Sequence, residues 1–150
     1  MILNTRSKLN KLDKNLLYYL ASPYTAKGLT GNARKALQHT RYIDITHIGA
    51  VLMADYGLLV LTPITASYGI VMHDPTSRLG GDWEQWKALD EKQITQCDGG
   101  LIVAMMEGWK ESTGVTAEIQ HAKALGKPIY YLEPNLVIGA KNAVHNARTS

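Results

Sequence analysis

The chain of 150 residues has the length of one globular domain and can bury a core without disulfides. Hydrophobic residues make up 45% and charged residues 19%, which excludes a disordered or fibrous chain. The net charge of +3 is too small for a typical nucleic-acid binder, and a single cysteine excludes a disulfide scaffold and fits a reducing cytoplasm.

Residues 1–15 are predicted to form a basic lead-in that is partly frayed and solvated. Its cations are followed by no apolar stretch of 7–15 residues, so it does not have the pattern of a secretory signal. No apolar run reaches the roughly 20 residues that span a bilayer. We therefore expect a cytoplasmic protein without a membrane segment, with one folded domain over residues 16–134 and a C-terminal tail over residues 135–150.

The first half of this domain begins with a short apolar and aromatic segment, residues 16–21, which predicts a buried strand ended by Ser22-Pro23. Residues 32–56 carry apolar side chains at helical spacing and predict a long helix that ends at Gly57. Residues 58–61 predict a second buried strand. Residues 64–81 contain several glycines and a proline and predict a long loop, whose length indicates a functional role.

The second half repeats the alternation of helix and strand. Asp82 is predicted to cap a helix, with Gln85 at the capping-box position three residues later. Residues 99–105 predict a third strand, residues 115–125 a helix and residues 129–132 a fourth strand. This order predicts an α/β fold, a doubly wound Rossmann- or flavodoxin-like parallel sheet with helices on both faces. Ligands of such sheets bind outside the carboxyl ends of the strands.

Two carboxylates lie on helix faces that are otherwise apolar. Asp90 lies one turn from Trp86 and from Ile94, and Glu118 shares a face with Val115. Burial raises the pKa of a carboxyl, and a pair with one protonated and one ionised member can act as general acid and nucleophile. The alternative is that each acid reaches water at the edge of its apolar stripe.

Two short turns follow predicted strands and are candidate binding segments. Ser112-Thr113-Gly114 leads into a helix, so its backbone N–H groups can face an anion, although a serine there can also simply cap the helix. Ser22-Pro23-Tyr24 follows the first strand and can equally be an ordinary turn. The five histidines share no ligand spacing, and no glycine motif matches a P-loop or a dinucleotide fingerprint. We expect neither a metal nor a cofactor.

Several segments in order along the chain carry a family resemblance over about residues 18–134. They are Tyr19 to Tyr24, the Trp83–Trp86–Asp90 spacing with Asp98 eight residues after Asp90, Ser112 to Glu118, and Gly108-Trp109 through Gly126-Lys127-Pro128. Together they resemble the nucleoside 2-deoxyribosyltransferase-like superfamily, in one of its bacterial and phage branches. They are also similar to the 2′-deoxynucleoside 5′-phosphate N-hydrolases.

The resemblance implies catalytic roles for three residues. Glu118 matches the glutamate that attacks the anomeric carbon of a deoxyribosyl group, and Tyr19 matches the tyrosine that holds it. Asp90 matches the aspartate that contacts the base and helps it leave, whereas Asp98 is interpreted as structural. Further candidate substrate-binding residues are Ser112, Gly114, Ser22, Tyr24 and Trp86.

Two departures from the family pattern bear on the substrate. Six positions before the glutamate, the transferases carry an acidic residue and the monophosphate hydrolases carry serine. In this chain that position is Ser112. It favours a nucleotide substrate, because a hydroxyl at a helix N-terminus accepts a phosphate group. The glycine-rich turn of the hydrolases is replaced by Ser22-Pro23-Tyr24, so half of that phosphate site is not reproduced. Base identity and the choice between hydrolysis and transfer stay open.

The predicted function is cleavage of the N-glycosidic bond of 2′-deoxynucleosides or their 5′-monophosphates. One alternative is a non-catalytic sensor of nucleotides or ADP-ribose-like ligands, and another is a glycohydrolase of NAD or cyclic ADP-ribose. A nucleic-acid-binding protein ranks third, because the basic residues are scattered along the chain. The resemblance also implies a homo-oligomer, in which the tail around Asn135 could complete a neighbour's site.

Overall fold

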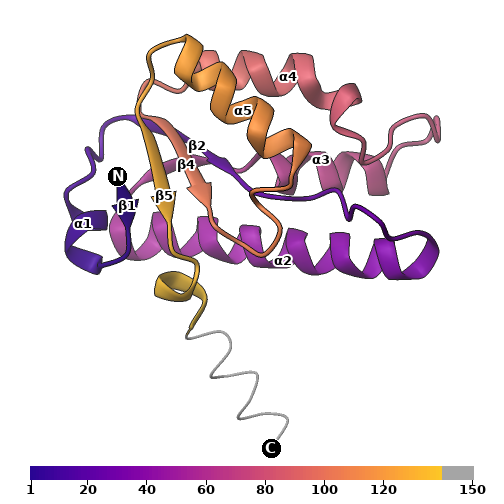
Figure 1. Ribbon diagram of the computed structural model, residues 1–150, viewed down its shortest axis with the longest axis horizontal. Coiled ribbons are helices and arrows are strands. Elements are labelled where there is room, and N and C mark those ends of the chain that lie inside the picture. Colours follow the sequence, from indigo (N-terminus) through magenta and orange to yellow (C-terminus); the bar gives the residue numbers. More distant parts are fainter. Residues whose placement is uncertain (140–150) are drawn as a thin grey trace, which may run out of the picture.

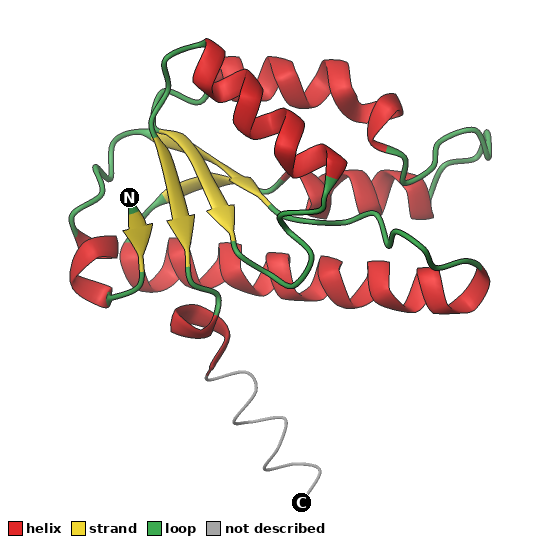
Figure 2. Cartoon of the chain, in the orientation of Figure 1, coloured by secondary structure: helices red, strands yellow, loops and turns green. Residues whose placement is uncertain are grey.

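The computed structural model describes residues 1–139, which form an α/β fold with a five-stranded parallel sheet. Strand order is β1-β5-β4-β2-β3, with helices on both faces (Figures 1 and 2). The elements in chain order are β1 (Ile2–Leu3), α1 (Arg6–Asn10), β2 (Leu17–Ala21), α2 (Gly31–Tyr56), β3 (Leu59–Leu61), α3 (Pro63–Met72), α4 (Trp83–Gln96), β4 (Gly100–Ala104), α5 (Thr113–Ala124) and β5 (Ile129–Leu132). The predicted fold class is confirmed, and each of the four predicted strands lies within one residue of its expected bounds.

The two faces of the sheet bury separate apolar cores. In β2, Tyr18 and Leu20 face a core formed with α1 and α2, whereas Tyr19 and Ala21 face a second core formed with α4 and α5. Both sets are buried because helices cover both faces of a parallel sheet. The strand alternation therefore directs the Tyr19 side chain toward α4 and α5.

Helix α2 confirms the predicted long helix and ends at Gly57, whose φ of 64° is left-handed. Its apolar face is buried only in the C-terminal half, where Ile48 and Leu52 pack on the sheet; Ile43, predicted on the same face, is 38% exposed. Twenty-six helical residues span about 39 Å, about twice the length of a five-residue strand. The N-terminal half therefore projects beyond the sheet (Figure 1).

The prediction of a frayed N-terminal lead-in is wrong. Ile2 and Leu3 pair with β5, and α1 follows with Thr5 as its N-cap. Leu3 and Leu9 are fully buried in the α1–α2 core. The apolar residues between the cations anchor the segment while the charges face solvent.

The long loop predicted over residues 64–81 is also wrong in its first half. Pro63 occupies the first turn of α3, where its missing N–H costs nothing, and the helix continues to Met72. Gly69 lies inside the helix with no neighbour near its α-carbon, so it is tolerated there. The remaining loop leads directly to α4.

The capping box predicted for α4 does not form, although the helix does begin after Asp82. The Asp82 carboxylate pairs with Arg34 at 3.2 Å. The Gln85 side chain accepts from Gly80 N at 2.7 Å and donates to the Arg78 carbonyl at 2.9 Å. Gln85 thus closes the preceding loop instead of the helix end.

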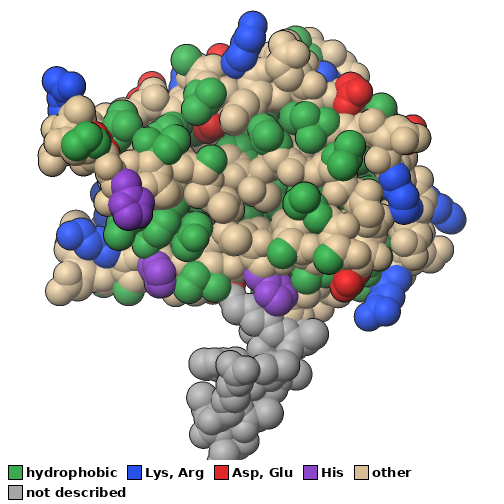
Figure 3. Space-filling model, turned by 180° about the vertical axis from the view of Figure 1, so that it is seen from behind, with side chains coloured by type: hydrophobic (Ala, Val, Ile, Leu, Met, Phe, Trp, Pro, Cys, Tyr) green, Lys and Arg blue, Asp and Glu red, His purple; other side chains and the backbone are tan. Residues whose placement is uncertain are grey.

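The predicted tail is partly structured. Residues 135–139 are helical and Val137 is buried in the α1–α2 core, while residues 140–150 lie outside the described part of the chain. No helix within residues 1–139 is long and apolar enough to cross a membrane. Seen from behind, hydrophobic side chains are spread over the middle of the surface and lysines and arginines lie around its periphery (Figure 3).

Replacing Gly100 should destabilise the fold because this residue has a φ of +90° and a Cβ there would lie 2.2 Å from the Pro128 carbonyl oxygen. We expect Gly100→Ala to lower the free energy of unfolding by about 3 kcal/mol in urea denaturation. Gly69→Ala is the matched control and should raise it by about 0.5–1 kcal/mol, since Gly69 is helical and unobstructed. Equal stability of the two variants would contradict the geometry at the start of β4.

Candidate functional site

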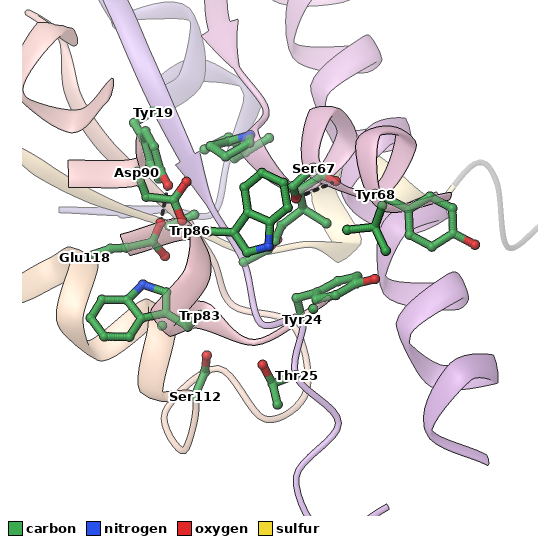
Figure 4. A pocket seen from close by; sticks show the side chains of 18 of the residues that line it. Tyr19, Tyr24, Thr25, Ser67, Tyr68, Trp83, Trp86, Asp90, Ser112 and Glu118 are labelled. Atoms are coloured by element: carbon green, nitrogen blue, oxygen red, sulfur yellow. Dashed lines mark hydrogen bonds between the residues drawn. The ribbon is translucent and has the colours of Figure 1, made fainter. Parts of the chain in front are cut away.

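A pocket of about 590 Å³, including its open mouth, lies at the carboxyl end of β2. It is bounded by α3, by the start of α4 and by the start of α5 (Figure 4). All eight candidate residues from the sequence line it: Tyr19, Ser22, Tyr24, Trp86, Asp90, Ser112, Gly114 and Glu118. Four different elements and loops therefore bring the predicted residues into one cavity, at the position that parallel α/β sheets favour.

Glu118 is the most buried acidic residue of the pocket. It lies in the second turn of α5 and is 8% exposed. The Tyr19 hydroxyl donates a hydrogen bond to its Oε2 (Figure 4). Because Tyr19 is itself completely buried, this contact fixes the carboxyl against the end of β2.

Asp90 reaches the same pocket from α4. Its carboxyl is half-buried, and burial raises its pKa to about 6, although hydrogen bonding with Tyr19 acts in the opposite direction. Burial raises the pKa of Glu118 to about 8; the Tyr19 hydrogen bond lowers it and the charge of Asp90 raises it. At neutral pH and without a ligand, Glu118 therefore holds a proton more tightly than Asp90.

Tyr19 connects the two carboxyls. Burial raises the pKa of its hydroxyl well above the ordinary value, and the charges of Glu118 and Asp90 raise it further. The hydroxyl consequently keeps its proton and is a permanent donor. Its hydrogen bond goes to Glu118, and the negative charge of Asp90 lies close enough to raise the pKa of the hydroxyl.

The start of α5 forms a polar end of the pocket. Ser112 is the N-cap, as predicted, and its Oγ accepts from Val115 N at 3.2 Å, which leaves the hydroxyl proton free to donate. The amides of Thr113 and Gly114, in the first turn, have no intrahelical acceptor. These donors and the positive end of the helix dipole suit an anion.

The β2–α2 loop closes over this polar end. The hydroxyls of Thr25 and Ser112 lie across from each other (Figure 4). Lys27 donates from Nζ to the carbonyl of Glu111 at 2.7 Å, which ties this loop to the start of α5 and adds a positive charge nearby.

Aromatic rings form the opposite walls. Trp86 donates from Nε1 to the Gly80 carbonyl at 2.7 Å, which fixes its ring beside Asp90. Tyr68 of α3 meets Tyr24 edge-on at 6.5 Å between centroids. Aromatic side chains that line a pocket suit a flat heterocycle.

Side chains of α2 contact Tyr68. It stacks on Tyr42 at 4.1 Å between ring centroids, and its hydroxyl hydrogen-bonds His39 Nδ1 at 2.7 Å. The sequence analysis missed Tyr68 because its segment was predicted to be a loop. Trp83 was named only for its spacing from Trp86 and Asp90 and not as a site residue, yet it lines the pocket.

Asp98 does not line the pocket and lies just before the first residue of β4. Its Oδ1 accepts from Leu17 N at 2.6 Å, which confirms its interpretation as a structural residue. Within residues 1–139, no three His, Cys, Asp or Glu side chains are grouped closely enough to hold a metal ion.

A family model described as a domain of unknown function (DUF1937) matches residues 17–133. This segment contains every candidate residue and all strands of the sheet except β1. No curated protein matches the chain.

The burial of Glu118 should make the stability of the protein depend on pH. The pKa is raised from 4.5 to about 8, so the folded state holds a proton that the unfolded chain releases in this interval. The contribution of Glu118 to the free energy of unfolding is thus fully present below pH 4.5 and is lost as the pH rises toward 8. Relative to Glu118→Gln, the wild type should lose roughly 3–5 kcal/mol across that window in urea denaturation at several pH values.

Glu107→Gln removes an exposed glutamate and is the control. It should keep the pH dependence of the wild type. A Glu118→Gln variant with the same pH dependence as the wild type would show that Glu118 ionises at its ordinary pKa.

Proposed function

We propose that this chain, which belongs to the DUF1937 family, cleaves the N-glycosidic bond of 2′-deoxynucleosides or their 5′-monophosphates with Glu118 as the nucleophile. The observation that carries the proposal is the buried Glu118 carboxyl, hydrogen-bonded by Tyr19 in the same pocket as Asp90. The resemblance of the sequence motifs to the nucleoside 2-deoxyribosyltransferase-like superfamily supports it.

The first step forms a glycosyl ester. An oxygen of ionised Glu118 bonds to the anomeric carbon as the carbon–nitrogen bond breaks. The electron pair of the broken bond goes to the base nitrogen. Asp90 gives its proton to the leaving base. The positive charge that develops on the sugar is stabilised by the adjacent carboxylate. In the second step the anomeric carbon bonds to water or to a second base as its bond to Glu118 breaks. Glu118 leaves as a carboxylate, and Asp90 takes the proton of the attacking molecule.

This chemistry needs the proton on Asp90 and not on Glu118, the reverse of the preference in the empty pocket. Tyr19 favours this arrangement because its hydrogen bond lowers the pKa of Glu118, and the proton that Glu118 releases goes to Asp90 in the same pocket. The positive charge that develops on the sugar in the transition state stabilises the ionised Glu118 further. Tyr19 is thus a positioning residue for Glu118.

The pocket offers a place for each part of a nucleotide. The base lies between Trp86, Tyr24 and Tyr68, close to Asp90, and the 5′ group extends toward Ser112. Ser112 carries no charge and caps a helix, so it accepts a phosphate that a carboxylate would repel. These features favour the 5′-monophosphate over the free nucleoside.

A non-catalytic nucleotide-binding protein is the second candidate. The observation that favours it is the pKa of about 8 for Glu118, since a protonated carboxyl binds an acceptor but does not attack carbon. Turnover decides between the two functions.

Homo-oligomeric assembly and a cytoplasmic location are further parts of the proposal, and both rest on sequence reasoning. Exposed apolar side chains that a second copy could cover include Met53, Leu59 and Met72.

The activity is tested by incubating the protein with each common deoxynucleotide and deoxynucleoside, and with NAD, with and without an acceptor base. We expect chromatography to show free base from at least one deoxynucleotide. Glu118→Gln should lower the rate of base release by at least about 10³-fold. Net release indicates a hydrolase and base exchange a transferase.

Glu107→Gln is the control for the activity and should release base at the wild-type rate. Equal release by wild type and Glu118→Gln would overturn the role of Glu118. Tight binding without release by any variant would favour the second candidate.

Tyr19→Phe tests the effect of the Tyr19 hydroxyl on Glu118. Removing the hydroxyl takes away the hydrogen bond that lowers the pKa of Glu118, so ionisation should require a higher pH. We expect the ascending limb of the profile of kcat against pH to move upward, with about 10²-fold lower kcat at neutral pH. Loss of activity with an unmoved limb would indicate that the hydroxyl orients Glu118 without changing its pKa.

A further inference from the structure

We infer that the indole N–H of Trp83 binds the 3′-hydroxyl of the substrate's sugar, an assignment that rests on the proposed function. Among residues 1–139, Trp83 Nε1 is one of the buried side-chain polar atoms that have no hydrogen-bond partner. Leaving a buried N–H without an acceptor is unfavourable because its hydration is lost and nothing replaces it. Trp83 lines the pocket, and a ligand oxygen that displaces the groups covering this nitrogen would remove that penalty.

The neighbouring tryptophan shows the contrast. Trp86 already donates to the Gly80 carbonyl at 2.7 Å, so its ring serves as a wall. Ser22 Oγ is also buried and unpartnered in this pocket, but a hydroxyl both donates and accepts and so does not define the ligand atom. An indole N–H can only donate, which restricts its partner to an acceptor.

The position of Trp83 is set by α4 and α5 together. Gly114 lies beneath the ring, where a Cβ would be 3.1 Å from Trp83 Cδ1, and Lys87 Nζ lies 5.3 Å from the ring centroid. The indole is therefore confined between the first turns of the two helices. Its nitrogen edge faces Glu118 (Figure 4).

The acceptor must belong to the part of the substrate that lies beside Glu118. If Glu118 attacks the anomeric carbon, that part is the sugar, and the base lies toward Asp90 and Trp86. The 2-deoxyribosyl ring offers its ring oxygen and a single ring hydroxyl, at C3′, while its 5′ group extends toward Ser112. The ring oxygen is a poor acceptor because it takes up the positive charge that develops during the reaction. The 3′-hydroxyl oxygen is thus the acceptor that the geometry indicates.

The test compares a 2′-deoxynucleoside 5′-monophosphate with its 2′,3′-dideoxy counterpart. Wild type should prefer the deoxynucleotide in kcat/KM, and Trp83→Phe should lower kcat/KM for it by about fivefold to tenfold and leave the dideoxynucleotide unchanged. Trp109→Phe alters a tryptophan that packs on Tyr131 outside this pocket and should keep the wild-type preference. Calorimetric titration of the same ligands gives the preference in binding, independent of turnover.

Gly114→Ala provides a second variant if Trp83→Phe does not fold. Its Cβ presses on Trp83 Cδ1, so it should reduce the same preference without removing any side-chain donor. Thermal unfolding checks that each variant is folded.

The outcomes separate this inference from the proposed function. Turnover with the same loss on both ligands, or with no loss, would overturn the Trp83 assignment alone. In a third outcome, the wild type binds the deoxynucleotide more tightly than the dideoxynucleotide but turns over neither, and Trp83→Phe loses this preference in binding. That outcome would support the assignment and overturn the proposed function. Absence of both binding and turnover would overturn both.

Discussion

The hydrogen bond from Tyr19 to Glu118 is the interaction on which the site depends. It joins β2 to the second turn of α5 and stabilises a carboxyl that burial would otherwise leave without a partner. Burial also makes the carboxyl a stronger base, because it disfavours the charged form. The contact with Tyr19 acts in the opposite direction: it lowers the pKa and so favours the ionised form that the proposed attack needs.

The sheet explains why this contact can exist. Successive residues of β2 point to opposite faces, so Tyr18 packs with α1 and α2 while Tyr19 points to α4 and α5. Because β2 lies between β4 and β3, its carboxyl end is flanked by the loops that lead into α3 and α5. A pocket at that point receives a carboxylate from α4, a capped helix N-terminus from α5 and an aromatic wall from α3.

Sequence reasoning located the site residues better than it described their surroundings. Asp90 and Glu118 were recognisable because helical spacing put an acid on an apolar face, a pattern that burial seldom tolerates without a role. The placement of Tyr19 and of Ser112 followed from strand alternation and cap chemistry together with the family resemblance. That these residues line the same pocket depends on tertiary structure, which spacing within a single helix or strand does not predict.

The failures have separate physical causes. Helix α3 was missed because Gly69 weakens the helical signal, and with it Tyr68 was lost from the pocket wall. The first strand was missed because two residues carry no periodicity; Leu3 is held by pairing with Leu132, far along the chain. Trp83 was not selected as a site residue because helical spacing does not show whether a side chain has a hydrogen-bond partner, and only the structure shows that its nitrogen lacks one.

Covalent trapping tests the central claim, that Glu118 bonds to the sugar. A substrate with fluorine at C2 of the sugar slows both steps by destabilising the positively charged transition state, and a good leaving base lets the ester accumulate. We expect mass spectrometry to find one glycosyl group on the peptide that contains Glu118. Release of base with no adduct, or with an adduct on another residue, would contradict the account.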